Sequence, residues 1–309
     1  MPELATVSPV PEREIEGRSP WRLAFDRLRH DRVAIASAVV IVLVALMVVF
    51  APVVSAIVGH GPDTQYRTTG LSPAGIPVGP NSTFLLGTDE LGRDVLVRIF
   101  YGARVSLLAG VGASVIAVAI GVVIGLLAGY FSGPVDTALS RFMDVVLSLP
   151  YLVFAIALIS VVGPSLVVSI AVIAFFSFAS VGRIVRGQVL SIRQKEFVEA
   201  SQSLGAGDLR IMFVDILPNV LAPVIVYTTL LIPLAIVFEA TLSFLGLGVV
   251  PPTPDWGSML AESVQDYQVA WWYVVFPGLA LLITTLAFNL LGDSVRDAFD
   301  PRYKRTTAR

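Results

Sequence analysis

The chain has 309 residues, of which 55 % are apolar and only 14 % are charged. Soluble domains carry about 25 % charged residues, so this composition is typical of a membrane protein. The net charge of −2 excludes a nucleic-acid binder that acts through bulk positive charge. The chain has no Cys and only two His, which excludes disulfides, thiolate catalysis and a metal site rich in Cys or His.

Two polar segments precede the first apolar stretch. Residues 1–20 contain four Pro and mixed charge, which predicts a disordered cytoplasmic tail. Residues 21–32 place Trp21, Phe25 and Leu28 on one helical face, as in a short amphipathic helix that lies on the inner leaflet. A basic flank that only sets the membrane orientation explains this segment equally well.

Five long windows without charge follow. A membrane-spanning helix needs about 20 apolar residues, and these windows hold 30, 31, 38, 23 and 26 uncharged residues. The longest contains the turn pair Gly163-Pro164, which divides it in two. Helices satisfy their own backbone groups in lipid, so we expect an all-α polytopic membrane protein. The six transmembrane helices are predicted at 33–58, 108–130, 142–162, 165–182, 216–245 and 271–292.

Basic residues in the loops predict the orientation. With both termini and every second loop inside, 17 Lys and Arg face the cytoplasm and four lie in the outer segments. Both termini, including the tail 303–309, are therefore expected in the cytoplasm, and the outer loops are 59–104 and 249–270. The run Trp271–Tyr273 suits an aromatic belt where the last helix enters the membrane.

The first outer loop is expected to end in a helix that Thr88 caps. Asp89 and Arg93 have the spacing of an i,i+4 ion pair on that helix. Asp94 and Arg98 have the same spacing, and such a pair contributes only about 0.2–0.5 kcal/mol. The pattern fits a helix on the outer membrane surface, or a plain extension of the next transmembrane helix.

Three features lie inside the predicted spans. Glu239 is the lone acid deep in an apolar stretch, so it is expected to face a translocation path or a partner subunit. The alternative is a hydrogen-bonded structural residue nearer the outer end. Gly121, Gly125 and Gly129 have the four-residue spacing that suits close helix packing, and Pro150 can bend the third span.

The polar segment 183–215 separates the fourth and fifth predicted spans. It contains two helical stretches around Gly205-Ala206-Gly207, and Asp208 can cap the second stretch. Such a hairpin forms a short rigid element below the membrane, and its small residues allow a partner to approach closely. The face of the first stretch consists of Phe197, Ala200, Ser201 and Leu204.

The sequence of this hairpin resembles the signature of a known family. The stretch E-A-S-Q-S-L-G, then nine residues, then D-I-L-P is similar to the E-A-A-x3-G-x9-I-x-L-P signature of the permease subunits of bacterial ABC importers. Ser201 replaces the second Ala, and Asp215 takes the Ile position. The residues in register are Glu199, Ala200, Gly205, Leu217 and Pro218.

Three further motifs are similar to one branch of that family, the C-type subunit of dipeptide, oligopeptide and nickel importers. The first two are Gly87–Arg104 and Phe244–Glu262, and the third joins Phe276–Gly278 to Phe288–Arg302. Four motifs in the right order over residues 20–302 are very specific. The resemblance implies the type I ABC importer permease fold, with a permease core at 105–302.

The resemblance also implies a function in the bacterial cytoplasmic membrane. The chain would be one permease subunit of an ATP-driven importer, with peptide as the favoured substrate and nickel or another small solute as the alternative. Its partners would be membrane lipid, a second, B-type permease, two cytoplasmic ABC ATPases that bind ATP and Mg, and an extracytoplasmic binding protein. Phe197–Gly205 would be the coupling helix, in which Glu199 contacts an ATPase and Gly205 makes the turn.

The sequence limits the other functional classes. It contains no G-x-x-x-x-G-K-[ST] sequence, so the chain is not the ATP-hydrolysing subunit, and no cofactor is expected in it. A self-sufficient secondary transporter is the rival, but no clear inverted repeat is seen. A membrane enzyme needs a nucleophile–base or metal constellation. No catalytic or metal-binding residue is predicted.

Overall fold

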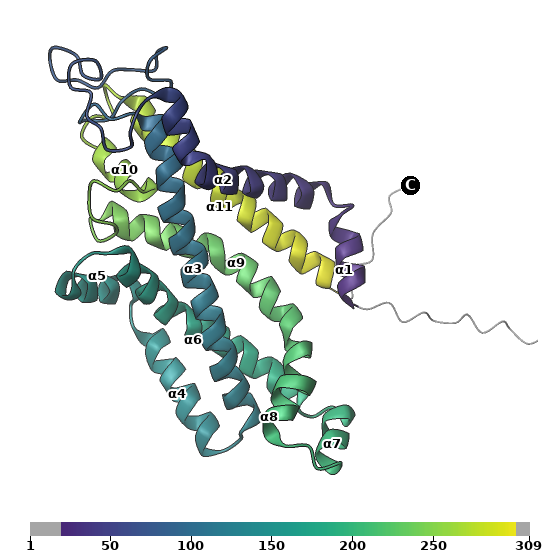
Figure 1. The fold of residues 1–309 in the computed structure, drawn as a ribbon. Helices are drawn as coiled ribbons and strands as arrows, with labels where there is room; N and C mark the ends of the chain where they lie inside the picture. Colours follow the sequence, from purple (N-terminus) through teal and green to yellow (C-terminus); the bar gives the residue numbers. More distant parts are fainter. Residues whose placement is uncertain (1–19, 301–309) are drawn as a thin grey trace, which may run out of the picture.

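A computed structural model describes residues 20–300. These residues form a bundle of helices that are joined by loops and turns (Figure 1). The expected tails 1–20 and 303–309 lie outside the described residues, except for Pro20. Five long, apolar helices confirm the predicted class of an all-α membrane protein. They are α2 (Arg32–Val58), α3 (Val95–Tyr130), α6 (Leu166–Ile192), α9 (Leu217–Phe244, continued from α8, Asp208–Arg210) and α11 (Trp271–Phe299).

The third predicted span, 142–162, is wrong as a single helix. The chain instead forms α4 (Pro134–Ser148) and α5 (Tyr151–Val162), and the two helices meet at 86°. Pro150 explains the break, because the residue before a proline is pushed out of the helical region. Leu149 accordingly has ψ of 133°. If the bent pair counts as one span, the molecule has the expected six.

The helix α3 is the centre of the fold and packs along α6. A Cβ atom on Gly121 would lie 2.5 Å from the Cβ of Val181. A Cβ atom on Gly125 would lie 2.6 Å from the carbonyl oxygen of Gly182. Only glycine allows two helix backbones to approach this closely, so the predicted role of the glycine spacing is confirmed.

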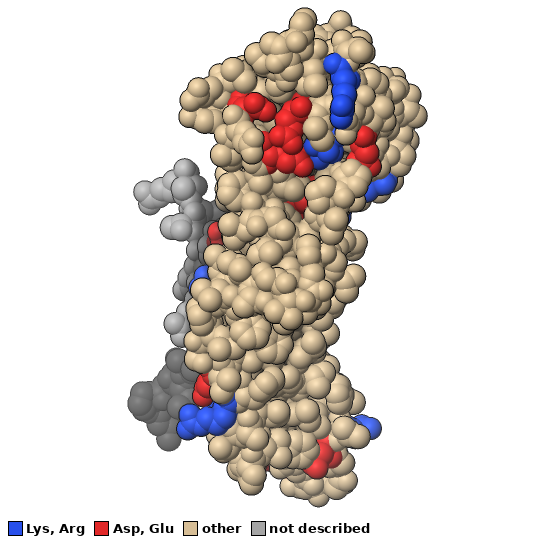
Figure 2. All heavy atoms as spheres, turned by 90° about the vertical axis from the view of Figure 1, so that its left-hand side faces the viewer, with Lys and Arg blue, Asp and Glu red and all other residues tan. Residues whose placement is uncertain are grey.

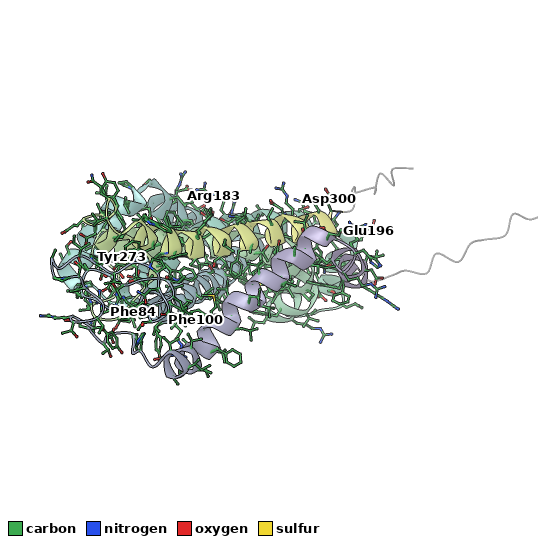
Figure 3. The ribbon with its side chains drawn as sticks, turned by 90° about the horizontal axis from the view of Figure 1, so that it is seen from above. Phe84, Phe100, Arg183, Glu196, Tyr273 and Asp300 are labelled. Carbon is green, nitrogen blue, oxygen red and sulfur yellow. The ribbon has the colours of Figure 1, made fainter. Side chains whose placement is uncertain are left out.

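The helix α1 (Pro20–Leu28) forms where the amphipathic pattern predicts it. It packs on the end of α11, where the rings of Trp21 and Phe299 lie 5.1 Å apart edge to face. Arg27 donates a hydrogen bond of 2.9 Å to the carbonyl oxygen of Ala298. Viewed from above, α2 and α11 converge toward α1 (Figure 3). Phe25 is 67 % exposed, and its contact with a lipid leaflet stays a prediction.

The two ends of the helical bundle carry different structures (Figure 1). One end, called the loop end below, consists of residues 59–94 and 245–270 and contains α10 (Trp256–Ser263). The opposite end, called the hairpin end, contains α7 (Glu196–Ser203), α8 and the end of α3. On the face in Figure 2, charged side chains gather at the two ends, and the surface between them is almost uncharged.

Candidate functional site

The helix α7 is held to the bundle by one buried side chain. Val198 is completely buried and belongs to the main apolar core. Glu196 and Glu199 lie in the first turn of α7, where acidic side chains interact favourably with the helix dipole. The eight-residue helix is too short to be stable by itself in water, so its position depends on Val198 and on the two ends of the hairpin.

The outer side of the hairpin exposes large apolar side chains. Leu204 is 89 % exposed, and Phe197 is 46 % exposed. Leu209 and Phe213 continue the same exposed apolar set beyond the turn. These four residues are called the apolar tip below. Glu199 and Ala200 are exposed beside it, and Ser201 is half-buried. Large exposed apolar residues that lie close together are a typical feature of a protein-binding surface, and these four fall within one short segment of the chain.

The turn of the hairpin depends on Gly205. Its φ is +80°, and a Cβ atom there would meet nothing within 4 Å. Glycine is therefore required by the backbone conformation and not by lack of space. The amide of Ala206 donates to the carbonyl oxygen of Ser201 at 3.1 Å, which closes the end of α7. The predicted helix–glycine–helix hairpin is confirmed.

Asp208 does not cap the second stretch, so that prediction is wrong. The cap position of α8 is Gly207, and Asp208 is the first helical residue. The carboxylate of Asp208 instead accepts a hydrogen bond of 2.7 Å from the hydroxyl of Tyr130, the last residue of α3. No local pattern indicates this contact, because Tyr130 lies 78 positions earlier in the chain.

Leu217 and Pro218 lie where the hairpin joins α9. Residues 211–216 form a π-helical turn, and the amide of Leu217 donates to the carbonyl oxygen of Met212, five residues earlier. Pro218 lacks an N–H group, and its ring would clash with the carbonyl group four residues before it in an ordinary α-helix. The wider π-helical turn, in which Leu217 bonds five residues back, lies directly before Pro218.

Glu239 is 1 % exposed and lies about one turn before α9 ends at Phe244. Its Oε1 atom accepts a hydrogen bond of 2.9 Å from the hydroxyl of Ser243. Asp255, which caps α10, interacts with it electrostatically. Glu239 is therefore buried near the loop end of this chain, and its contact with a translocation path or a partner subunit stays a prediction. Among residues 20–300, no three His, Asp or Glu side chains gather as metal ligands.

The segment before α3 differs from the predicted capped helix. The helix begins only at Val95, and Asp94 caps it by accepting a hydrogen bond of 2.8 Å from the amide of Leu96. Thr88 instead forms an isolated antiparallel bridge with Asp94, and its hydroxyl donates to the carbonyl oxygen of Gly70 at 2.6 Å. The expected cap at Thr88 is therefore wrong, and the helical part of this segment is an extension of the transmembrane helix.

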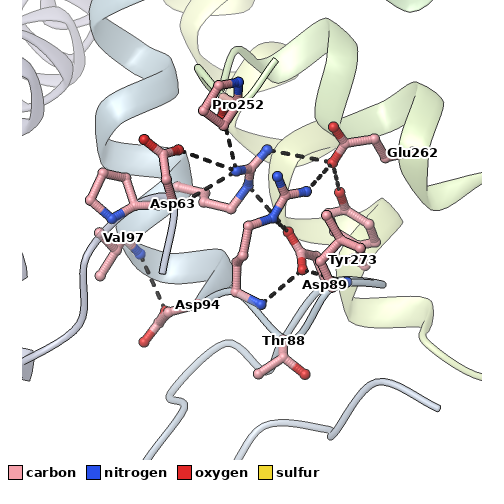
Figure 4. Close-up of polar contacts among 12 residues, drawn as sticks. Asp63, Thr88, Asp89, Asp94, Val97, Pro252, Glu262 and Tyr273 are labelled. Atoms are coloured by element: carbon pink, nitrogen blue, oxygen red, sulfur yellow. Dashed lines mark hydrogen bonds and ion pairs between the residues drawn. The ribbon is translucent and has the colours of Figure 1, made fainter. Parts of the chain in front are cut away.

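One of the two expected ion pairs, Asp89–Arg93, forms as part of a larger buried cluster, whereas the expected Asp94–Arg98 pair does not form (Figure 4). Asp89 binds Arg93 at 2.5 Å and Arg98 at 3.3 Å, so Arg98 pairs with Asp89 and not with Asp94. Glu262 binds the same two arginines, at 2.9 Å and 3.4 Å. The hydroxyl of Tyr273 donates to Glu262. These five residues, Asp89, Arg93, Arg98, Glu262 and Tyr273, are called the ionic cluster below.

The expected aromatic belt is reduced to one residue. Trp271 is 55 % exposed, whereas Trp272 and Tyr273 are buried in the loop end. The indole N–H of Trp272 donates to the carbonyl oxygen of Thr88 at 3.1 Å. The first turn of α11 therefore helps to hold the loop 59–94, together with the ionic cluster.

Comparison with known proteins identifies the family. Residues 121–305 match the family described as the binding-protein-dependent transport system inner membrane component. Residues 19–73 match the N-terminal TM domain of oligopeptide transport permease C. One chain of the MetNI methionine ABC transporter in an inward-facing conformation has a similar fold. Its TM-score is 0.54 at 17 % identity, and the likeness covers 65 % of this chain and 96 % of that chain.

Curated relatives match almost the full chain. The dipeptide transport system permease protein DppC of Alkalihalophilus pseudofirmus is 41 % identical over 96 % of this chain and 95 % of its own length. The oligopeptide transport system permease protein OppC of Escherichia coli is 42 % identical over 94 % and 93 %. The chain therefore belongs to the inner membrane components of binding-protein-dependent ABC transport systems, in which it is a permease of the C type.

Proposed function

We propose that this permease imports peptides and that its hairpin end is the site where an ATPase subunit drives it. The peptide assignment is supported by relatives named for dipeptide, di/tripeptide and oligopeptide transport, which are 41–42 % identical to this chain. The full assembly contains a second, B-type permease, two ATPases that bind ATP and Mg, and an extracytoplasmic binding protein.

The observation that carries the coupling role is the apolar tip. The tip residues Phe197, Leu204, Leu209 and Phe213 are exposed on a hairpin whose helix α7 has Val198 as its one buried side chain. Leaving such side chains in water is unfavourable by roughly 25 cal/mol per Å² of apolar surface, so a partner that covers them gains free energy. Glu199 stands exposed beside Ala200 and supplies a charge at the edge of that contact.

The orientation follows from the charges. The arrangement with the hairpin end inside gives that side 17 of the 21 basic residues, so we infer that the hairpin end faces the cytoplasm. The loop end then faces outward, where a binding protein delivers the substrate. ATP-driven movement of the ATPases shifts α7, and the shift reaches the transmembrane helices through the hairpin.

The test uses the absence of Cys from the chain. A single Leu204→Cys variant carries one thiol at the apolar tip, and a Leu85→Cys variant carries one at the loop end, where Leu85 is 56 % exposed. Each variant is treated with a bifunctional thiol reagent in native membranes, and the crosslinked partners are identified by mass spectrometry. We expect Leu204→Cys to capture a P-loop ATPase and Leu85→Cys not to capture one.

Two results would contradict the proposal. If Leu204→Cys captures no ATPase while the second permease still co-purifies, the hairpin is not the docking site. The substrate is tested separately with the complete transporter in proteoliposomes, where labelled dipeptide and labelled nickel are offered in parallel. Uptake of nickel without uptake of peptide would replace the substrate assignment and leave the coupling role untouched.

A further inference from the structure

One residue at the end of α3 contacts the segments before, within and after α7. The hydroxyl of Tyr130 donates to the carboxylate of Asp208 at 2.7 Å. The side chain of Gln202, in α7, contacts the same hydroxyl. The carbonyl oxygen of Tyr130 accepts a hydrogen bond of 2.9 Å from Arg193, which follows α6. Tyr130 itself is only 7 % exposed.

These contacts are the polar link between the hairpin and α3. Among residues 20–300, every side-chain hydrogen bond that joins residues 193–210 to another transmembrane helix ends on Tyr130. The hairpin is also joined covalently to α6 and α9, but it has no such connection to α3. Tyr130 therefore offers a movement of α7 a direct polar route to α3, beside the apolar core that Val198 enters.

The other end of α3 lies at the ionic cluster, so this link connects the two ends of the molecule. The helix runs for 36 residues from Tyr130 to Val95, and its first turn carries Arg98 of the ionic cluster. Close packing on α6 makes α3 stiff along this length, since Gly125 and Gly129 bring the two backbones into contact. A displacement of one end of such a helix is transmitted to the other.

The hydroxyl of Tyr130 is chemically suited to this role. It donates to an ionised acceptor, and hydrogen bonds of this type are about twice as strong as neutral ones. The ring packs edge to face on Phe131 at 5.1 Å and does not need the hydroxyl for that contact. Removal of the hydroxyl therefore breaks the polar link and leaves the packing in place.

We propose that Tyr130 is a positioning residue that transmits the movement of α7 to α3. The inference rests on the proposed docking of an ATPase at the hairpin end. The Tyr130–Asp208 hydrogen bond keeps the start of α8 fixed to the end of α3, so that the hairpin and α3 move as one body. Without the hydroxyl, the hairpin follows the ATPase while α3 lags behind.

The test is the coupling ratio of the complete transporter in proteoliposomes, measured as peptide taken up per ATP hydrolysed. We expect Tyr130→Phe to lower this ratio about 2- to 30-fold, the range that a coupling free energy of about 0.5–2 kcal/mol produces. The amount of complex and its ATPase content stay at the wild-type level. A matched control is Tyr101→Phe, which removes a hydroxyl from the other end of the same helix.

Two variants of Asp208 test the same hydrogen bond from the acceptor side. Asp208→Asn keeps an acceptor oxygen and should retain most of the ratio, whereas Asp208→Ala should lower it as much as Tyr130→Phe does. The double variant Tyr130→Phe with Asp208→Ala should be no worse than either single one, because both remove the same bond. Additive losses in the double variant would contradict the inference.

The failure of the inference and that of the proposed function are distinguishable. A wild-type coupling ratio in Tyr130→Phe, with the ATPases still bound, overturns the role of Tyr130 and leaves the docking site intact. If the Leu204→Cys variant with an intact Tyr130 does not crosslink to an ATPase, the proposed docking is overturned, and the role of Tyr130 with it.

Discussion

The loop end buries a cluster of paired charged side chains, whereas the hairpin end exposes a set of large apolar side chains. At the loop end, two arginines and two acids pair inside the chain, and Arg98 is only 1 % exposed. At the hairpin end, the apolar tip is exposed, and the buried side chain of Val198 anchors α7. The charges of the ionic cluster are paired within this chain. The hairpin end exposes the apolar side chains that we propose an ATPase covers.

Removal of Arg98 should have the largest effect, because it breaks a buried cluster of ion pairs. Arg98→Met leaves the carboxylates of Asp89 and Glu262 with one arginine in place of two. Breaking a buried ion pair from one side costs about 3–5 kcal/mol. We expect a much lower melting temperature of the purified chain in detergent, whereas Arg67→Met, at an exposed residue, should leave it unchanged. Equal melting temperatures would show that the ionic cluster does not hold the loop end.

The contact between α3 and α6 should be the next most sensitive place. Gly125→Ala puts a methyl group 2.6 Å from a backbone oxygen of α6. Overpacking of this kind costs about 1–3 kcal/mol. Gly112→Ala is the matched control, because its methyl group would meet only Ile170, at 3.8 Å. Thermal unfolding of both variants measures the difference, and a control that unfolds as early as Gly125→Ala would argue against the close contact.

A change at the hairpin turn separates transport from folding. Gly205→Ala forces a side chain into a left-handed conformation, at a cost of about 1–2 kcal/mol. We expect normal amounts of folded chain and a clear loss of peptide uptake into vesicles. Gly207→Ala should behave like wild type, since its φ is −73°. Full uptake in Gly205→Ala would mean that the angle of the hairpin is unimportant.

The apolar tip should give the smallest effect on the chain itself. Leu204→Asp changes an 89 % exposed residue, so the free energy of unfolding should stay within about 0.5 kcal/mol. The ATPase that co-purifies with the tagged chain should decrease, because the charge opposes burial in the partner. Leu85→Asp, at the loop end, is the control. Undiminished ATPase in the Leu204→Asp preparation would exclude Leu204 from the interface.

The features that local patterns determine could be predicted from the sequence. The apolar windows predict the five long helices, because lipid favours helices of that length. The glycine spacing predicts the α3–α6 contact, and Gly205 predicts the hairpin turn. In each case the cause lies within a few neighbouring residues, or in one spacing along a helix.

The features that depend on distant residues could not be predicted. Glu262 lies 169 positions after Arg93 and 164 after Arg98, so no local pattern indicates the ionic cluster. Thr88 and Asp94 are both suitable caps by residue type, and Thr88 is instead bonded to the distant residues Gly70 and Trp272. The 86° bend at Pro150 exceeds a simple kink and separates two helices.

The comparison of the two ends is tested most directly by hydrogen–deuterium exchange of the chain in complex with the second permease, with and without the ATPases. Amides in a segment that a partner covers exchange more slowly. We predict stronger protection of residues 196–210 when the ATPases are present and no change at residues 81–92. Unchanged exchange at 196–210 in an assembly that contains bound ATPases would contradict the account.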